Sequence, residues 1–335
     1  MSRLLAASVT LPTSTIPIFR TVASLREWRR KAYLEQKSVG FVATMGALHD
    51  GHISLLKHSL SRNDLTVLSI FVNPAQFAPT EDLSTYPRTL EADLALLEQT
   101  KVPEPSTESE RITSAIFMPT VQDMYPSGIT QDVSGQKGTF IEVKGYGHQM
   151  EGGSRPGFFR GVATVVTKLF NAVEPTDTYF GQKDIQQGLL LRRMCRDLLL
   201  SHPEPGHLHI MPTVRSPVDG LALSSRNAYL SPNDRKHASS LYATLNVCKD
   251  AWRDLRDKNL AIEKALAYLK ERSSAAEADG VLIKPDYIHM NDPDTFDDVQ
   301  TYEEGKAVIL SGAMWVGKTR LIDNIILGNA EGILG

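Results

Sequence analysis

Short apolar runs alternate with longer amphipathic segments through the first part of this chain, and this alternation limits the folds that it can adopt. The runs have the length of strands, whereas the longer segments space their apolar residues along one face of a helix. Parallel strands need long crossover connections, which helices usually provide. The pattern therefore predicts an α/β fold with a doubly wound parallel sheet. The predicted strands are 39–45, 65–72, 115–118 and 177–180, and the predicted helices are 53–60, 90–97, 161–173 and 185–200.

A different pattern, two helical segments followed by two strand-like ones, begins at about residue 207 and predicts a smaller α+β domain. These segments are 233–256 and 261–273 for the helices and 286–290 and 306–310 for the strands. The length of 335 residues suits two domains of roughly 150 residues each. We therefore expect a first domain over 1–207, in which 1–17 form a disordered extension, and a second domain over 208–335.

The overall charge excludes some classes of partner. Lysine and arginine number 36 against 39 aspartates and glutamates, which gives a net charge of −3 at pH 7. A chain without a basic field is not drawn to nucleic acid or to an anionic membrane surface, so we expect neither as a partner. No apolar run reaches the length of about 18 residues that a membrane span needs.

Two features bear on the cellular compartment. Cys195 and Cys248 lack the spacing of a metal or redox motif, so we expect buried thiols in a reducing environment. The N-terminal segment carries Arg3 and Arg20 and no acid before Glu27, which is faintly similar to an organelle transit segment. Because it lacks a strongly basic amphipathic helix, we expect a cytoplasmic protein.

The junction between the first predicted strand and its helix, Gly46–His52, is the best candidate for a ligand site. A helix N-terminus offers free N–H groups and the positive end of the helix dipole, and both favour an anion. His49 and His52 lie three residues apart and point the same way, so they add donors whose charge is expected to adjust near neutral pH. The segment therefore predicts a cradle for a nucleoside triphosphate. The alternatives are a metal site between the histidines and an ordinary helix start.

Further polar clusters follow other predicted strands, and ligands of doubly wound sheets bind beyond these strand ends. Asn73 and Gln76 offer carboxamides that can recognise a hydroxy acid, with a plain turn as the alternative. Lys183 stands at a second strand-to-helix junction and strengthens the prediction of a phosphate site, with an exposed helix cap as the alternative. A loop over 223–227 adds two hydroxyls and a guanidinium that can grip phosphate, with an ordinary serine-rich loop as the alternative. A glycine-rich segment over 149–161 is expected to form a flap, with a plain solvent loop as the alternative.

A motif near the C-terminus points to a different function. Gly312–Thr319 fits the P-loop pattern GxxxxGK[ST] and follows the strand-like segment 307–311. A P-loop opens a nucleotide-binding domain and needs later strands to supply a Mg²⁺ ligand, but only 320–335 follow here. A P-loop NTPase or kinase is therefore the second hypothesis for function, and a catalytically silent nucleotide-binding protein is the third.

Taken in order, these segments resemble the pantothenate synthetase family, also called the pantoate:beta-alanine ligase family. The likeness runs from about Ile18 to the C-terminal region. Even the P-loop-like motif has a counterpart, because the family ends in a run similar to Val316–Asn324. The motifs that carry the resemblance are Thr44–His52, Phe71–Phe77, Tyr86–Thr89, Glu151–Pro156, Lys183–Gln187 and Asp219–Asn227.

The resemblance implies an ATP-dependent, AMP-forming ligase of the nucleotidyltransferase superfamily with a Rossmann-like catalytic domain. In this family the pantoate carboxylate attacks the α-phosphorus of ATP to give pantoyl adenylate, and beta-alanine then displaces AMP to give pantothenate. By resemblance His49, His52, Lys183 and Arg226 are catalytic, with His52 as proton donor. The implied ATP site comprises Met45, Gly46, Ala47, Leu48, His49, Asp50, Gly51, His52, Gly181, Gln182, Lys183, Asp184, Val214, Leu223, Ser224, Ser225 and Arg226.

The resemblance also implies the other ligands and partners. The residues implied for substrate binding are Gln76 and Gln187 for pantoate, with Asn73, Tyr86 and Arg155 as further contacts. Asp93, four residues beyond Thr89, is the expected ligand of Mg²⁺. The partners are the small molecules pantoate, beta-alanine and ATP, and the family implies a homodimer.

The chain departs from the common bacterial pattern of the family around the expected site. Ala75 replaces a methionine and Ile185 replaces an aromatic residue. Gln182 replaces a glutamate and Phe158 replaces a histidine, so a charge and an imidazole are missing near the pocket. We therefore expect intact chemistry with an altered pH dependence.

Overall fold

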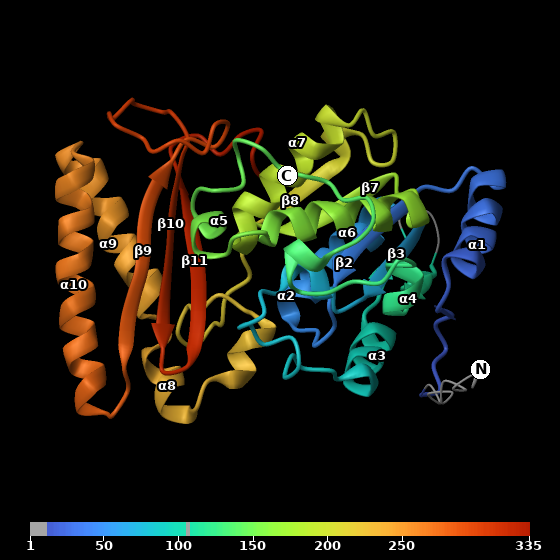
Figure 1. Cartoon of the computed structure of the whole chain (residues 1–335), viewed down its shortest axis with the longest axis horizontal. Coiled ribbons are helices and arrows are strands. Elements are labelled where there is room, and N and C mark those ends of the chain that lie inside the picture. The colour runs from blue at the N-terminus through green and yellow to red at the C-terminus, as the bar shows by residue number, and fades with distance from the viewer. Residues whose placement is uncertain (1–11, 105–107) are drawn as a thin grey trace.

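A six-stranded parallel sheet organises the first domain (Figure 1). The computed structural model describes residues 12–104 and 108–335 of the chain. In spatial order the strands are β1 (Ile18–Phe19), β6 (Ala115–Phe117), β3 (Leu65–Ile70), β2 (Val39–Thr44), β7 (Asp177–Gly181) and β8 (Leu208–Met211). From β2 the chain builds outward to β3 and β6, and it then returns to add β7 and β8 on the other side. The predicted doubly wound sheet is confirmed, and its strand order reverses between β2 and β7.

Helices cover both faces of this sheet because successive strand residues point to opposite sides. Phe41 of β2 packs in the apolar cluster that contains α1, α6 and α7, whereas its neighbour Val42 packs in the cluster that contains α2 and α3. In β6, Phe117 packs in the first of these clusters and Ile116 in the second. The helices are α1 (Val22–Leu34), α2 (Asp50–Arg62), α3 (Leu90–Gln99), α6 (Phe158–Val173) and α7 (Ile185–Asp197), with two short helices, α4 (Val121–Met124) and α5 (Glu151–Ser154).

Strand β8 belongs to the first domain, so the boundary between the domains lies later in the chain than expected. We predicted that the first domain ends at residue 207, but β8 pairs with β7 over its whole length and completes the first sheet. The prediction was wrong because a four-residue strand that is buried on both faces carries no alternation of apolar and polar residues. The C-terminus also returns to this strand, since the N–H of Gly335 donates to the carbonyl of Ile210 at 3.1 Å. Arg192 of α7 secures the same tail by donating to the carbonyls of Gly332 and Ile333.

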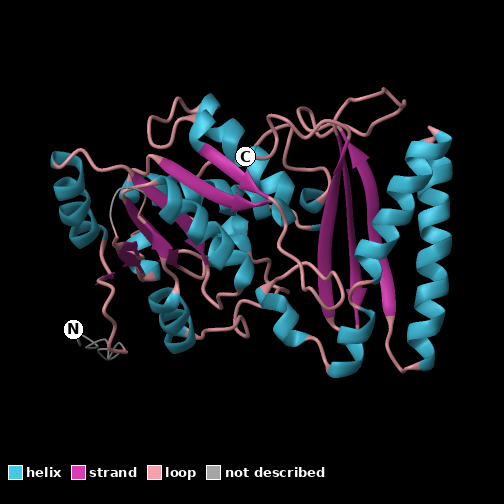
Figure 2. Cartoon of the chain, turned by 180° about the vertical axis from the view of Figure 1, so that it is seen from behind, coloured by secondary structure: helices cyan, strands magenta, loops and turns pink. Residues whose placement is uncertain are grey.

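The second domain is an antiparallel sheet covered on one side by two long helices (Figures 1 and 2). Its elements are α8 (Pro232–His237), α9 (Ser240–Leu255), α10 (Lys258–Ala278), β9 (Ile283–Asn291), β10 (Val308–Val316) and β11 (Thr319–Leu327). Leu245 of α9 and Leu269 of α10 share an apolar cluster with Leu310 of β10. The expected α+β domain is confirmed, although the helix predicted over 233–256 is divided into α8 and α9. No helix in the described part of the chain combines the length and the apolar character that a membrane span needs.

The P-loop-like motif forms part of a β-hairpin. Gly312 to Val316 are paired residues of β10, Thr319 begins β11, and Gly317 and Lys318 form the turn between the strands. Gly317 has a φ of +56°, which suits glycine at a tight turn. A P-loop needs a helix after the glycine-rich loop so that backbone N–H groups converge on phosphate, and here a strand follows instead. The P-loop hypothesis is therefore wrong.

The predicted N-terminal extension is partly ordered. The hydroxyls of Ser14 and Thr15 both donate to Glu98 of α3 at 3.0 Å, and Ile16 is buried. The expectation of disorder over 1–17 is therefore wrong for these residues, because a partner more than eighty positions away holds them. The rest of that expectation, over 1–11, lies outside the described residues.

Candidate active site

Two strand-to-helix junctions meet where the strand order reverses. β2 leads to α2 and β7 leads to α7, and the carboxyl ends of these neighbouring parallel strands open on the same crevice. A cavity of about 220 Å³ lies there and adjoins a cleft of about 800 Å³, with Lys183 and Arg226 on the wall of both. Together they match the size of small-ligand sites. The expected site residues on the wall of the smaller cavity are Met45, His49, Gly51, His52, Asn73, Gln76, Tyr86, Arg155, Gly181, Lys183, Asp184, Gln187, Val214, Leu223, Ser224, Ser225 and Arg226.

The histidine pair begins α2 as the sequence predicts. His49 is the N-cap, and its Nδ1 accepts the backbone N–H of Gly51 at 3.1 Å. This bond fixes the tautomer, because a neutral imidazole that accepts at Nδ1 carries its proton on Nε2. His52 lies in the first turn, with 4.1 Å between the two ring centroids. The two rings are therefore held side by side at the positive end of the helix.

Both imidazoles are neutral at neutral pH. Burial, followed by the positive charge of Lys183, lowers the pKa of His49 to about 4. Burial, followed by His49 and then Lys183, lowers the pKa of His52 well below its usual range. The expectation that these charges adjust near neutral pH is therefore wrong, because the sequence reveals neither the cavity around the rings nor the nearby lysine. Each ring can still donate one N–H to a phosphate oxygen.

Asp93 has a different task from the metal binding that we expected. It is buried, and its two carboxylate oxygens accept the backbone N–H of Ala47 at 3.0 Å and of Leu48 at 2.8 Å. The hydroxyl of Thr89 donates to the same carboxylate at 3.1 Å. Gly46 and Ala47 have positive φ angles of 81° and 49°, so the turn before α2 is strained at a residue other than glycine. Asp93 therefore holds this turn in place, and its oxygens are occupied.

Asn73 is a buried residue of the cavity wall that also supports its neighbours. Its Oδ1 accepts the hydroxyl of Tyr125 at 2.6 Å, and its Nδ2 donates to Oε1 of Gln76 at 3.1 Å and to the carbonyl of Gly161. Gln76 in turn donates to the sulfur of Met45 at 3.2 Å. Asn73 therefore orients Gln76, which lies on the cavity wall with Gln187.

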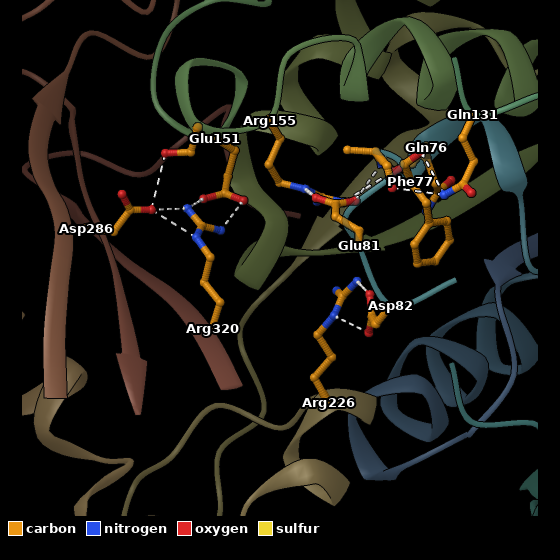
Figure 3. A network of polar contacts seen from close by, with 12 residues as sticks. Gln76, Phe77, Glu81, Asp82, Gln131, Glu151, Arg155, Arg226, Asp286 and Arg320 are labelled. Carbon is orange, nitrogen blue, oxygen red and sulfur yellow. Dashed lines mark hydrogen bonds and ion pairs between the residues drawn. The ribbon is translucent and has the colours of Figure 1, made fainter. Parts of the chain in front are cut away.

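Two arginines of the expected site are paired with acids from one loop (Figure 3). Arg155 donates to both carboxylate oxygens of Glu81, at 2.6 and 2.9 Å, and its guanidinium lies 3.7 Å from the ring centroid of Phe158. Arg226 forms the same two-point contact with Asp82, at 3.0 and 3.1 Å. Burial opposes ionisation of Asp82, but the hydrogen bonds and charge of Arg226 outweigh it and lower the pKa of the carboxyl. The loop of Glu81 and Asp82 thus neutralises both guanidinium groups.

The loop Leu223–Asn227, here called the serine–arginine loop, docks on the turn before α2. The hydroxyl of Ser225 donates to the carbonyl of Ala47 at 3.0 Å, and the N–H of Leu223 donates to the carbonyl of Val214 at 3.0 Å. The first of these bonds holds the segment near residue 225 against the segment near residue 47. Sequence reasoning placed both segments in one site, and the structure joins them directly.

Some expected ATP contacts point elsewhere. Leu48 packs into the apolar cluster of α2 and α3, and Asp50 is exposed on the first turn of α2. Gln182 turns away to donate to Asn324 of β11 at 3.2 Å. The side chains of these residues therefore support the fold or face solvent, and Gly46 and Ala47 contribute the backbone of the turn.

Sequence reasoning assigned no role to three residues that shape the site. Glu81 and Asp82 hold the arginines, and their signal in the sequence was an acidic pair shortly before Tyr86. Gln186 is buried, accepts the N–H of Glu151 at 3.0 Å and donates to the carbonyl of Gln149 at 2.9 Å. Gln186 thereby fixes the glycine-rich flap that was predicted over 149–161, and nothing in the sequence pattern separates it from its neighbours.

Among the described residues, no group of three or more histidine, cysteine, aspartate or glutamate side chains is placed to hold a metal ion. Asp184 does line the cavity, with its side chain 46% exposed and 3.6 Å from the ammonium of Lys183. Mg²⁺ in nucleotide sites is commonly held by one or two carboxylates together with phosphate oxygens and water. The side chains present thus fit a metal that enters with a triphosphate better than one held by a protein cage.

Comparison with known families decides what kind of site this is. A family model described as pantoate-beta-alanine ligase matches residues 17–326. This chain belongs to the pantoate-beta-alanine ligase family. A relative named pantoate--beta-alanine ligase, from Saccharomyces cerevisiae, is 42% identical over 323 residues, which cover 92% of this chain and 99% of the relative. The pantothenate synthetase of Thermotoga neapolitana is 40% identical and covers 93% of this chain and 99% of its own length.

Solved structures of pantoate-beta-alanine ligases share the fold. The enzyme from Thermus thermophilus has a TM-score of 0.77 and 37% identity, covering 94% of this chain and 100% of its own. The enzyme from Francisella tularensis, titled as a complex with beta-gamma ATP and beta-alanine, has a TM-score of 0.68 and 32% identity over 93% of this chain and 98% of its own. Both domains of this ligase-family chain therefore have counterparts in solved structures.

Replacement of Asp93 by asparagine is expected to destabilise the protein in the absence of Mg²⁺ and nucleotide. The carboxamide accepts with one oxygen and turns an NH₂ group towards an N–H donor, so the free energy of unfolding should fall by about 1–3 kcal/mol. Urea denaturation measures this, with Asp50→Asn as the control because Asp50 is exposed nearby. A metal-binding Asp93 would instead leave the stability of the metal-free protein unchanged.

As the pH is lowered, the protein is expected to lose stability partly because His49 becomes protonated on unfolding. Its native pKa of about 4 lies below the unfolded value of 6.5, so between these values the unfolded chain binds more protons and folding weakens as the pH drops. The His49→Gln variant lacks this titration. Between pH 7 and pH 4 its free energy of unfolding should therefore fall by about 1–3 kcal/mol less than that of the wild type. Denaturant titrations at several pH values measure the difference, and parallel curves would contradict the assignment.

Proposed function

We propose that this chain condenses pantoate with beta-alanine, using ATP and forming pantothenate, AMP and pyrophosphate through pantoyl adenylate. The observation that carries the proposal is the meeting of two strand-to-helix junctions and the serine–arginine loop in one cavity. Family membership identifies the reaction, and the geometry supports it with groups suited to a triphosphate. We further propose a cytoplasmic homodimer, on the basis of family membership alone.

In the first half-reaction a pantoate carboxylate oxygen forms a bond to the α-phosphorus, and the bond from that phosphorus to the pyrophosphate oxygen breaks. Negative charge grows on the α-phosphate and on the leaving group. Lys183 supplies positive charge beside the histidine pair, and α2 directs its N-terminal dipole at the same space. Neutral His49 and His52 add N–H donors, and His52 is proposed to act as a hydrogen-bond donor to a phosphate oxygen, because a neutral imidazole does not serve as the proton donor that the resemblance implies.

Arg226 must exchange partners during this step if it is to reach the phosphates. Without substrate its guanidinium is neutralised by Asp82 in a two-point contact. A triphosphate offers more negative charge and the same two-point geometry, so it can replace the carboxylate. The Asp82 pairing therefore keeps a half-buried cation from standing alone before the nucleotide arrives.

The proposed place of pantoate is the part of the cavity wall that carries two glutamines. The carboxamides of Gln76 and Gln187 lie there and can recognise hydroxyl and carboxylate groups. Phe158, Val162 and Val166 supply an apolar side for the branched carbon chain. In the second half-reaction the amine of beta-alanine bonds to the acyl carbon of the adenylate, the bond to AMP breaks, and one amine proton is lost.

We propose that Mg²⁺ accompanies the triphosphate, held by phosphate oxygens with the carboxylate of Asp184 available on the cavity wall. When bound it would neutralise phosphate charge. Asp93 does not serve this purpose, since its oxygens hold the turn before α2.

Product analysis tests the proposed reaction. The purified protein is incubated with ATP, Mg²⁺, pantoate and beta-alanine, each omitted in turn, and AMP is separated from ADP. The proposal expects pyrophosphate release that depends on pantoate, and pantothenate only when beta-alanine is present. Release of ADP would contradict an adenylating ligase, and ATP binding without turnover would favour the silent nucleotide-binding protein.

His52→Ala is expected to slow adenylate formation by roughly 10²-fold or more, because it removes a donor that is already oriented in the site. Pantoate-dependent exchange of pyrophosphate into ATP measures this half-reaction. His58→Ala is the matched control, since His58 is exposed on the same helix. Equal rates in the two variants would exclude a catalytic role for His52.

A further inference from the structure

We propose that Asn324 of β11 is a positioning residue that holds the turn carrying Lys183, so that the second domain sets the place of a catalytic cation in the first. The inference rests on the proposed role of Lys183 in ATP activation. Asn324 itself does not line the cavity that holds the histidine pair. It acts through the backbone of the segment that follows β7.

The side chain of Asn324 makes three hydrogen bonds, and all of them reach that turn. Its Nδ2 donates to the carbonyl of Gln182 at 2.8 Å and to the carbonyl of Lys183 at 3.0 Å. Its Oδ1 accepts from Nε2 of Gln182 at 3.2 Å. Asn324 is only 2% exposed, so these bonds form away from water. A carboxamide is the group required, because the contact needs two donors and one acceptor.

The turn lacks side-chain support from its own sequence. Residues Gln182–Asp184 form a single 3-10 turn between β7 and α7. Gly181, at its start, has no side chain with which to cap the turn. Asp184, at the start of α7, makes no side-chain capping bond. Short 3-10 turns have poor hydrogen-bond geometry, so outside contacts decide their conformation. The contacts of Asn324, together with the N–H of Thr213, which donates to Oε1 of Gln182 at 3.4 Å, therefore fix where the chain carries Lys183.

Neighbouring residues of β11 make the strand a fixed support. Asp323 is buried and pairs with Arg215 through two contacts, at 2.5 and 2.8 Å, and it also accepts the backbone N–H of Asn324 at 2.8 Å. Arg320 pairs with Glu151 of the flap at 2.8 and 2.9 Å (Figure 3). Three positions of one strand thus hold three segments that surround the site. Asn324 is the member of this set that contacts the Lys183 turn.

The test is pantoate-dependent exchange of pyrophosphate into ATP, measured for Asn324→Ala, Lys183→Ala and the double variant. Misplacing a catalytic group by about 1 Å can cost 10²-fold, so Asn324→Ala should lower kcat by roughly 10- to 100-fold and leave the KM for pantoate unchanged. If Asn324 acts through Lys183, the double variant should be within about twofold of Lys183→Ala alone. Asn324→Ser, which keeps one donor, should fall between the wild type and the alanine variant.

Asn291→Ala is the matched control. Asn291 is a buried asparagine of β9 in the same sheet, and its Nδ2 donates to the carbonyl of Phe296 at 2.8 Å. It should lower the melting temperature as Asn324→Ala does, with kcat within about twofold of the wild type. If the alanine variant of Asn324 does not fold, the serine variant carries the same comparison, alone and with Lys183→Ala.

The outcomes separate this inference from the proposed function. No exchange by the wild-type protein would overturn the proposed function and this inference with it. Exchange by the wild type would uphold the function, and three results would then overturn the positioning role alone. The first is a kcat of Asn324→Ala within twofold of that of Asn291→Ala. The second is a kcat of the double variant that falls by the product of the two single losses. The third is a rise in the KM for pantoate of Asn324→Ala as large as its fall in kcat.

Discussion

The carboxylate of Asp93 and the two amides that it binds determine where α2 begins. The turn between β2 and α2 bends through two residues with positive φ, one of which is an alanine, and such a turn persists only when its surroundings hold it. Asp93 reaches it from α3 and fixes the N–H groups of Ala47 and Leu48. Because the turn is fixed, His49 caps α2 and Ser225 finds the carbonyl of Ala47. The histidines, the helix dipole and the serine–arginine loop all take their positions from this contact.

Charge in the site is balanced before any ligand enters. Arg155 and Arg226 each meet a carboxylate from the loop of Glu81 and Asp82, while the histidines remain uncharged because they are buried beside Lys183. Burying a lone guanidinium would cost several kcal/mol, so internal partners allow the cations to remain in the cavity. In the proposed role of Arg226, a nucleotide displaces the carboxylate of Asp82 rather than water. The proposed affinity for ATP is then a difference between two ion pairs of Arg226.

The sequence predicted the features that depend on local pattern. The alternation of short apolar runs with longer amphipathic segments predicted the parallel sheet, and polar residues after the strand ends predicted the cavity wall, because ligands of such sheets bind at that edge. Features that depend on contacts between distant residues were missed. The role of Asp93 follows from the distance between α3 and the turn, and the neutrality of His49 follows from burial and from a lysine more than a hundred positions away. The P-loop motif misled because spacing alone does not say whether a helix or a strand follows Lys318.

The return of the C-terminal tail to β8 has a consequence for how molecules behave towards one another. β8 is the last strand of the parallel sheet, and the outer edge of such a strand is a template on which a strand from another molecule can pair. The N–H of Gly335 already occupies the carbonyl of Ile210 on β8, and Arg192 secures the residues before it. The tail thus occupies part of the edge on which a strand of a second molecule would otherwise pair, so it covers backbone that the sheet would leave open.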